Sequence, residues 1–321
     1  MKRVVVTGGG GFVGQWLARA LLARGDDVTL AGLPPSGDVP PVLSNDERRQ
    51  LAWRHLDVRS ASDVDAMLDD VTPDIVVHLA GVAFPPAAER DPAAAYDVNT
   101  LGTVRLLASA ARHRAAGISD PVVLIVGTAF QYGRHDESEQ PLSESAELRP
   151  VSVYGASKAA QEIAALQAAR DRGLRVICTR SFNHSGAGQP TDYLLPALVR
   201  RVTQLRAGDA IRVGNDTVRD YLHVADVADA YVALCERGRA GEVYNVASGV
   251  GVGAHQLARD VLLQAGVRAD ISTDPSLMRA TDIPMLVGSP AKLARDTGWT
   301  PRRTRADIIE DLLRFANAAT N

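Results

Sequence analysis

Tyr154 and Lys158 stand four residues apart and are the side chains of this chain best suited to proton transfer. On a helix this spacing places a phenol and an ammonium on one face, where the positive charge favours the phenolate. Lowering a phenol pKa from about 10 to about 7 takes roughly 4 kcal/mol, which a close ammonium and a cationic nicotinamide can supply in a partly dry site. Such a phenol exchanges a proton with a carbonyl or carbinol oxygen while a hydride moves.

A hydroxyl group that could bind the same substrate oxygen comes from Thr128, which follows an apolar run over residues 122–126. The carboxyl ends of strands are where doubly wound folds gather their site residues, so this position suits a catalytic role. The segment His78-Leu79-Ala80-Gly81 closes another apolar run, and Asn99 begins a helical stretch. We expect both to lie near the same site.

Four consecutive glycines, residues 8–11, and Gly14 separate the first apolar run from the first helical stretch. At such a junction a dinucleotide pyrophosphate can meet bare backbone N–H groups at a helix N-terminus, because glycine leaves no Cβ in the way. Two spacings fit, Gly9-x-Gly11-x-x-Gly14 and Gly8-x-x-Gly11-x-x-Gly14, and the residues alone do not choose between them.

The second apolar run ends in Ala31-Gly32-Leu33, without the acidic residue that usually binds the ribose 2′-hydroxyl of NAD. This absence favours NADP(H), with NAD(H) still open, because a carboxylate would repel the 2′-phosphate. Arg48 and Arg49 could supply positive charge, although a solvated loop explains them equally well. Asp57 could accept a hydrogen bond from the adenine amino group, or be an ordinary surface aspartate.

Short apolar runs at residues 3–7, 28–31, 75–80, 122–126 and 175–179 alternate with helical periodicity, which predicts a parallel sheet with crossover helices. The expected fold class is α/β: a Rossmann-type doubly wound parallel sheet with a smaller C-terminal α/β substrate-binding region. We expect the NAD(P)-binding domain to span 1–180. Residues 181–321 should form the second region, which holds the substrate, with a segment at about 220–245 returning to the first domain.

The chain has 321 residues and a net charge of -3, which gives no reason to expect nucleic acid or an anionic membrane surface as a partner. Its two cysteines, Cys178 and Cys235, have no metal-ligand or disulfide spacing, so we expect no metal and a cytoplasmic location. The helical stretches near residues 100–112 and 157–170 carry alanine- and leucine-rich faces, which packing on the sheet would explain.

Taken together, the glycine turn, Thr128, Tyr154 and Lys158 resemble the extended short-chain dehydrogenase/reductase family over essentially the whole chain. That resemblance implies the spacing Gly8, Gly11 and Gly14, a triad of Thr128, Tyr154 and Lys158, and a supporting role for Asn99. It implies that Lys158 also holds the nicotinamide ribose. Members of this family commonly pair alanine- and leucine-rich helices like those near residues 100–112 and 157–170, so the resemblance also favours a homodimer. The residues expected to contact the cofactor are Gly8, Gly11, Phe12, Val13, Gly14, Asp57, Val58, Leu79, Ala80, Gly81, Asn99, Tyr154 and Lys158.

Three later stretches, residues 180–189, 218–227 and 243–246, resemble the nucleotide-sugar branch of that family, which implies that residues 181–321 mainly bind the nucleotide sugar. The stretches 182–184 and 278–288 are most similar to the reductases of GDP-4-keto-6-deoxy-D-mannose, which make GDP-D-rhamnose. This resemblance implies an oxidoreductase of deoxysugar biosynthesis that reduces the 4-keto group of a nucleotide-linked sugar, and it favours a GDP-linked one. It assigns Thr128, Asn183, Arg219 and Arg279 to the substrate, and the two guanidinium groups suit a diphosphate.

Two related activities and one unrelated class compete with this reading. Dehydratases carry acid and base carboxylates just after the catalytic hydroxyl, where this chain has Ala129 and Phe130, so dehydration is disfavoured. A nucleotide-sugar 4-epimerase, like UDP-glucose 4-epimerase, would retain its cofactor, usually NAD. A non-catalytic dinucleotide sensor would use the fold for binding alone and would need no proton donor.

Overall fold

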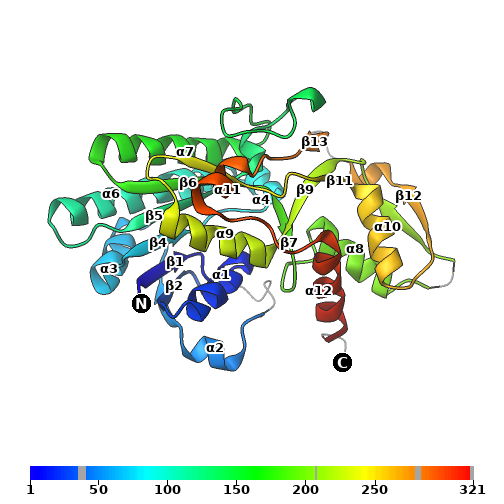
Figure 1. The fold of residues 1–321 in the computed structure, drawn as a ribbon, viewed down its shortest axis with the longest axis horizontal. Helices are drawn as coiled ribbons and strands as arrows, with labels where there is room; N and C mark the ends of the chain where they lie inside the picture. The colour runs from blue at the N-terminus through cyan, green and yellow to red at the C-terminus, as the bar shows by residue number, and fades with distance from the viewer. Residues whose placement is uncertain (35–40, 207, 279–282, 319–321) are drawn as a thin grey trace.

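The structure, a computed structural model, describes residues 1–34, 41–206, 208–278 and 283–318. Its centre is a seven-stranded parallel sheet in the order β10-β6-β5-β4-β1-β2-β3 (Figure 1). From β1 the chain adds β2 and β3 on one side, and it then adds β4, β5, β6 and β10 on the other side. This order is that of a doubly wound dinucleotide-binding sheet and confirms the expected fold class. The strands are β1 (Arg3–Thr7), β2 (Asp27–Gly32), β3 (Ala52–His55), β4 (Ile75–His78), β5 (Val122–Thr128), β6 (Arg175–Ser181) and β10 (Val243–Val246).

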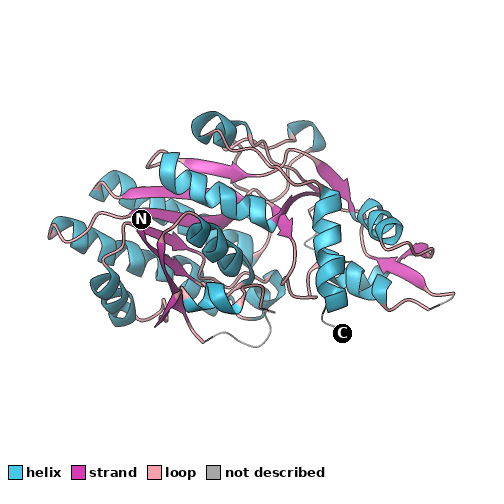
Figure 2. Cartoon of the chain, turned by 60° about the horizontal axis from the view of Figure 1, so that its bottom comes forward, coloured by secondary structure: helices cyan, strands magenta, loops and turns pink. Residues whose placement is uncertain are grey.

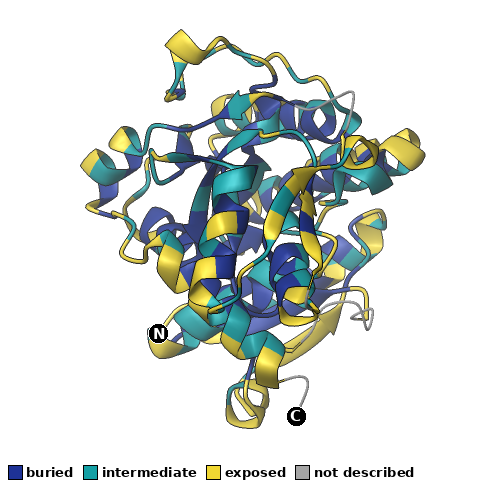
Figure 3. Ribbon diagram, turned by 90° about the vertical axis from the view of Figure 1, so that its right-hand side faces the viewer, coloured by how far each residue is buried: buried dark blue, intermediate teal, exposed yellow. Residues whose placement is uncertain are grey.

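Helices cover both faces of this sheet, as Figure 2 shows. One face packs against α1 (Phe12–Ala23), α9 (Val224–Arg237) and α11 (Ala291–Thr297). The other packs against α3 (Ala61–Val71), α6 (Gly102–Ala115) and α7 (Val153–Arg172). Successive strand residues therefore enter different cores, which is why these strands read as continuous apolar runs. The buried strands stand out at the centre of Figure 3.

A smaller region lies to the right of the central sheet in Figure 1 and has its own apolar core. A four-stranded sheet joins it to the first region, with β9 pairing with β7, β11 and β13, while β8 pairs with β12. Its elements are β7 (Asn183–Ser185), α8 (Leu194–Thr203), β8 (Ala210–Val213), β9 (Val218–His223), β11 (Gly251–Gly253), α10 (Ala254–Gln264), β12 (Asp270–Thr273), β13 (Met285–Leu286) and α12 (Arg305–Ala318).

Between β9 and β11 the chain returns to the central sheet, where α9 packs on α1 and β10 pairs with β6. The division of the chain near residue 180 stays a prediction. The short elements are α2 (Asn45–Arg49), α4 (Pro85–Arg90), α5 (Pro92–Tyr96), a π-helical turn at Asp97–Leu101, and 3-10 turns at Ala129–Gln131, Glu137–Glu139 and Pro275–Leu277.

The long connection over residues 133–150 is joined to the segment that carries β13. The Leu142 N–H donates to the Val287 carbonyl at 2.8 Å, and the Ser289 N–H donates to the Leu142 carbonyl at 2.8 Å. β13 in turn pairs with β9, which carries Arg219. Within the described ranges, no helix is both long and apolar enough to cross a bilayer.

Candidate active site

The glycine turn lies where β1 ends and α1 begins. Gly8 has a φ of +68°, and a Cβ there would lie 2.7 Å from the backbone nitrogen of Ala80. A Cβ on Gly14 would lie 2.5 Å from the Gly9 carbonyl oxygen, so the helix can approach the turn only without a side chain. Gly9 is crowded too, but it lacks the left-handed backbone of Gly8, which favours the spacing Gly8, Gly11 and Gly14.

Helix α1 starts at this turn with its first N–H groups available to a ligand. Its N-cap is Gly11, which supplies no capping side chain, and its first turn holds no acidic residue. The first N–H groups of a helix have no partner within it, and the helix dipole favours an anion there. The turn therefore fits a dinucleotide pyrophosphate. The Phe12 ring stacks on His184 of β7, with centroids 6.3 Å apart and planes 11° apart.

Helix α7 carries Tyr154 and Lys158 one turn apart, and both side chains are buried. Ser152 caps the helix by accepting from the Gly155 N–H at 3.1 Å, so the helix is already formed where the tyrosine stands. Lys158 Nζ donates to the Val126 carbonyl of β5 at 2.7 Å. It also lies near Gly81, where a Cβ would be 3.7 Å from Nζ. The structure thus brings the ends of β4 and β5 to this lysine.

Burial controls the protonation of both groups. It raises the pKa of Tyr154 to about 12, although a side-chain hydrogen bond with Thr128 opposes the rise, and it lowers the pKa of Lys158 to about 7. The structure therefore shows the opposite of the expected lowering of the phenol pKa. The ammonium is itself desolvated and donates to Val126 instead of the phenol. Tyr154 is held protonated, as a proton donor must be.

Asn99 connects the site residues of three segments. It lies in the π-helical turn, a geometry often found at functional sites, and is fully buried. Its Oδ1 accepts from the Val82 N–H at 2.8 Å, and its Nδ2 donates to Ser157 Oγ at 2.9 Å. Ser157 Oγ donates to the Tyr154 carbonyl at 2.9 Å. Asn99 therefore holds the start of α7 against the segment that follows β4.

Aromatic side chains lie near the phenol, and sequence reasoning did not single out Tyr193 or its neighbour Phe84. Phe130 lies edge-on to Tyr154, with ring centroids 6.0 Å apart. Tyr193, at the N-cap of α8, raises the pKa of Tyr154 electrostatically and contacts Phe84 at 5.7 Å between centroids. Because Phe84 and Tyr193 come from segments far from the triad, no local spacing pointed to them. Ala129 and Phe130 hold no ionisable group, so the residues after Thr128 cannot transfer a proton.

Three further residues expected at the cofactor serve visible structural roles. The Asp57 carboxylate is bound by Arg59 at 2.7 Å, which lowers its pKa. Val58 is buried against Gly102, where a Cβ would lie 2.8 Å from its side chain. The Ala80 N–H donates to the Thr7 hydroxyl at 3.3 Å. Contacts of these residues with a cofactor stay predictions, as do those of Val13 and Leu79.

Two of the predicted substrate residues, Asn183 and Arg219, lie on neighbouring strands of the second sheet, whereas Thr128 ends β5. Asn183 pairs in register with Tyr221 on β9, the strand that carries Arg219. Arg219 is buried and donates to the Val218 carbonyl at 2.8 Å, and its charge lowers the pKa of Tyr221, which burial raises to about 12. Arg279 lies outside the described residues. No cluster of metal-ligating side chains occurs in the part of the chain that the structure covers.

Fold and site together define a nicotinamide-dinucleotide-dependent enzyme of the short-chain dehydrogenase/reductase class. The chain belongs to the GDP-mannose 4,6 dehydratase family, whose sequence model matches residues 5–312. It is 34% identical over 316 residues to the GDP-6-deoxy-D-mannose reductase of Pseudomonas aeruginosa, covering 97% of this chain and 96% of the relative. The expected resemblance is confirmed.

Solved structures agree with this assignment. The structure of RMD from Pseudomonas aeruginosa complexed with NADPH matches 99% of this chain and all of its own, with 31% identity and a TM-score of 0.83. The Thermus thermophilus UDP-glucose 4-epimerase complex with NAD matches 99% of each chain with 26% identity and the same TM-score. The protein is thus similar to nicotinamide-dependent enzymes of nucleotide sugars, including both a reductase and an epimerase.

Proposed function

We propose that this protein reduces the 4-keto group of a nucleotide-linked 4-keto-6-deoxyhexose, converting GDP-4-keto-6-deoxy-D-mannose to GDP-D-rhamnose. The observation that carries the proposal is the arrangement of the site: the buried Tyr154 phenol interacts with the Thr128 side chain, and Thr128 is followed by Ala129 and Phe130, neither of which has a carboxylate. Such a site can donate a proton to an oxygen but lacks the acid and base that elimination of water requires. The similarity to a GDP-6-deoxy-D-mannose reductase supports the same reaction.

Each residue of the site has a distinct part in this reaction. The bound reduced nicotinamide supplies the hydride that adds to sugar C4. Tyr154 donates its phenolic proton to the oxygen on C4, and the Thr128 hydroxyl holds that oxygen in place. Lys158 binds the nicotinamide ribose, and once drawn from the Val126 carbonyl to the ribose and the phenol it favours the phenolate that remains. Asn183, Arg219 and Arg279 bind the nucleotide diphosphate sugar.

The direct test is to mix purified protein with NADPH and GDP-4-keto-6-deoxymannose and to follow the absorbance of the reduced nicotinamide. We expect one nicotinamide oxidised for each sugar reduced. dTDP-, UDP- and CDP-linked keto-sugars serve as comparisons for the base. If NADPH is oxidised with none of the four keto-sugars, the proposed reaction is wrong.

A 4-epimerase is the second candidate, because the Thermus thermophilus epimerase shares this fold at 26% identity. An epimerase returns the hydride to its own substrate, so it would keep its cofactor through purification and act without added NADPH. The reductase must exchange cofactor at each turnover. Protein that is purified free of nucleotide and is inactive until NADPH is added excludes the epimerase.

We assign NADP(H) as the preferred cofactor because β2 ends in Ala31-Gly32 with no acidic side chain for a ribose 2′-hydroxyl. The exposed side chain of Arg48 on α2 could offer positive charge to a 2′-phosphate. The similar structure with NADPH bound agrees with this choice. In titrations, the protein should bind NADPH more tightly than NADH. Equal affinities would mean that the protein does not recognise the 2′-phosphate, and the proposed preference would be wrong.

The protein is proposed to be a cytoplasmic homodimer. Leu101, Val104 and Ile163, near and on α6 and α7, expose 47%, 42% and 62% of their surface, which favours a partner for these helices. The two cysteines are unpaired and buried, as suits a reducing compartment. In gel filtration the parent should elute as a dimer and Ile163→Glu as a monomer.

A further inference from the structure

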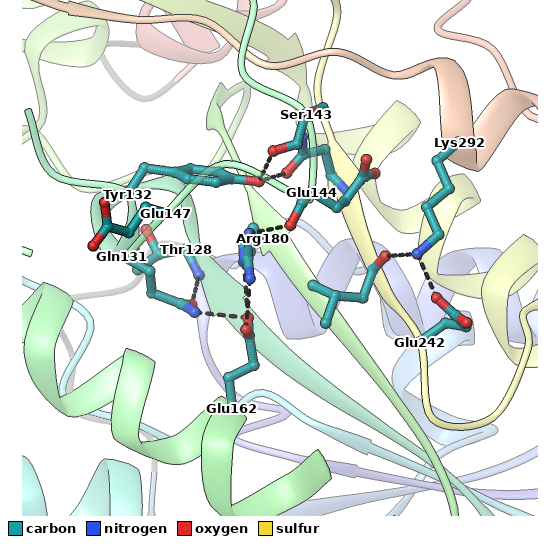
Figure 4. Close-up of polar contacts among 12 residues, drawn as sticks. Thr128, Gln131, Tyr132, Ser143, Glu144, Glu147, Glu162, Arg180, Glu242 and Lys292 are labelled. Atoms are coloured by element: carbon teal, nitrogen blue, oxygen red, sulfur yellow. Dashed lines mark hydrogen bonds and ion pairs between the residues drawn. The ribbon is translucent and has the colours of Figure 1, made fainter. Parts of the chain in front are cut away.

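A chain of buried polar side chains runs below Thr128, as Figure 4 shows. Its members, Gln131, Glu162 and Arg180, are 0%, 4% and 5% exposed. Burying such groups is costly unless every one is paired, so the pairing determines how each of them must be oriented.

Arg180 fixes the carboxylate of Glu162 in one orientation. Its Nε and a terminal nitrogen donate to the two carboxylate oxygens at 2.9 and 2.7 Å. Its other terminal nitrogen donates to the Glu144 carbonyl at 3.0 Å, and the guanidinium lies 4.7 Å from the centre of the Tyr132 ring. A two-pronged pair of this kind restricts direction as well as distance.

The carboxylate in turn fixes the amide of Gln131. Gln131 Nε2 donates to Glu162 Oε2 at 2.8 Å, and because a carboxylate only accepts, the amide nitrogen must face it. The amide oxygen then faces the opposite way and accepts from the Thr128 N–H at 2.8 Å. A Cβ on Gly127 would lie 2.3 Å from that oxygen, so the glycine before Thr128 makes room for it.

We propose that Gln131 is a positioning residue for Thr128. It transmits the orientation set by the Glu162–Arg180 pair to the backbone at the end of β5, so that the Thr128 hydroxyl meets both Tyr154 and the substrate oxygen. Glu162 follows Lys158 by one helical turn, so its pairing with Arg180 fixes α7 relative to β6, the neighbour of β5. This inference rests on the proposed reductase function, which gives Thr128 its part in the reaction.

The test uses Gln131→Met, which removes both hydrogen bonds and keeps the side-chain length. Gln161→Met is the matched control, since Gln161 is equally buried and bonds to Thr103 Oγ1 at 2.8 Å, away from Thr128. Hydride transfer is measured in a single turnover with NADPH and GDP-4-keto-6-deoxymannose at saturation. We expect Gln131→Met to be slower by about 10–100-fold, as misplacement by a fraction of an ångström would cause, with KM for both ligands unchanged. Gln161→Met should keep the parent rate, and thermal unfolding compares the stability of the two.

A second pair of variants separates positioning from general damage. In the Thr128→Val background, Gln131→Met should slow hydride transfer no further, because the hydroxyl that it positions is gone. The inference is wrong if the double variant loses rate by the product of the two single losses. It is also wrong if Gln131→Met alone transfers hydride at the rate of the unchanged protein. If the parent itself transfers no hydride to any keto-sugar, the proposed function falls and this inference with it. If the unchanged protein and Gln131→Met are equally active, the positioning role is refuted and the proposed function stands.

Discussion

Lys158 Nζ donates a hydrogen bond of 2.7 Å to the carbonyl of Val126, two residues before Thr128. The lysine of the proposed triad is thus tied to the strand that carries the threonine, and its burial lowers its pKa to about 7. The Tyr154 phenol keeps its proton, because burial raises its pKa to about 12. Binding of a ribose to Lys158 offers this ammonium new partners beside the phenol, which would couple cofactor binding to the acidity of Tyr154.

Replacing Tyr154 by Phe should abolish turnover while leaving cofactor binding nearly intact. The phenol is the proposed proton donor, and loss of a general acid costs about 10²–10⁴-fold in rate. Single-turnover hydride transfer and titration with NADPH measure the two effects separately. Binding that weakens as much as the rate falls would instead indicate a structural role for the phenol.

Lys158 should make the free energy of unfolding rise between about pH 7 and about pH 10 in the absence of cofactor. Its pKa falls from an ordinary 10.5 to about 7 on folding, so in this window the unfolded chain holds a proton that the folded protein lacks. The contribution has a slope of at most about 1.4 kcal/mol per pH unit and is lost as pH falls toward 7. Urea unfolding across the window should show a shallower rise for Lys158→Met, and the same slope as the parent for exposed Lys2→Met.

His78 should make the protein sensitive to acid. Burial, with the nearby Lys158 charge, lowers its pKa from 6.5 to about 3, and its Nδ1 is 2.7 Å from the Thr7 hydroxyl. Below about pH 6.5 this histidine binds a proton in the unfolded chain, but in the folded protein it stays neutral until about pH 3. The free energy of unfolding therefore decreases toward pH 3. Acid titration followed by circular dichroism should show a smaller decrease for His78→Gln. If the free energy of unfolding of His78→Gln decreases as much as that of the unchanged protein, other groups cause the acid sensitivity.

Gly8→Ala should weaken NADPH binding by at least about tenfold and also destabilise the fold, because a Cβ would lie 2.7 Å from the Ala80 nitrogen. Gly117→Ala is a close control, since Gly117 has the same φ of +68° and no atom within 4 Å of a Cβ. It should cost only the left-handed strain, about 1–2 kcal/mol, and bind NADPH normally. Equal binding by the two variants would place the pyrophosphate away from the glycine turn.

Arg219→Met should raise KM for the nucleotide sugar by about 10–100-fold and spare NADPH binding, because a charge-assisted contact to the diphosphate is lost. The buried guanidinium lies on β9, beside the strand of Asn183. Arg212→Met, whose parent side chain is 72% exposed on β8, should change neither constant. Steady-state kinetics with each ligand varied in turn distinguishes these outcomes, and an unchanged KM in Arg219→Met would remove this residue from the substrate site.

Much of the fold and the heart of the site follow from local patterns. The five predicted strands are all present, with ends that differ by one or two residues, and α1 ends where Gly25 takes a φ of +82°. β3 escaped prediction because it is an edge strand with all four residues exposed, so it lacks the apolar run of a buried strand. Lys292 donates to Glu242 at 2.6 Å and to the Val243 carbonyl at 2.8 Å, and no local pattern points to these contacts across about 50 residues.

The sequence by itself determined the class of the protein, because the glycine turn and the Tyr154–Lys158 pair are each formed by residues close together in the chain. Tertiary structure decided what depends on contacts between distant segments. The pKa values of Tyr154 and Lys158 are set by burial, and Tyr193 reaches the phenol from α8. Gln131 bonds to Glu162 across 31 residues. Such contacts leave no periodicity in the chain, since they arise only when sheet and helices have packed.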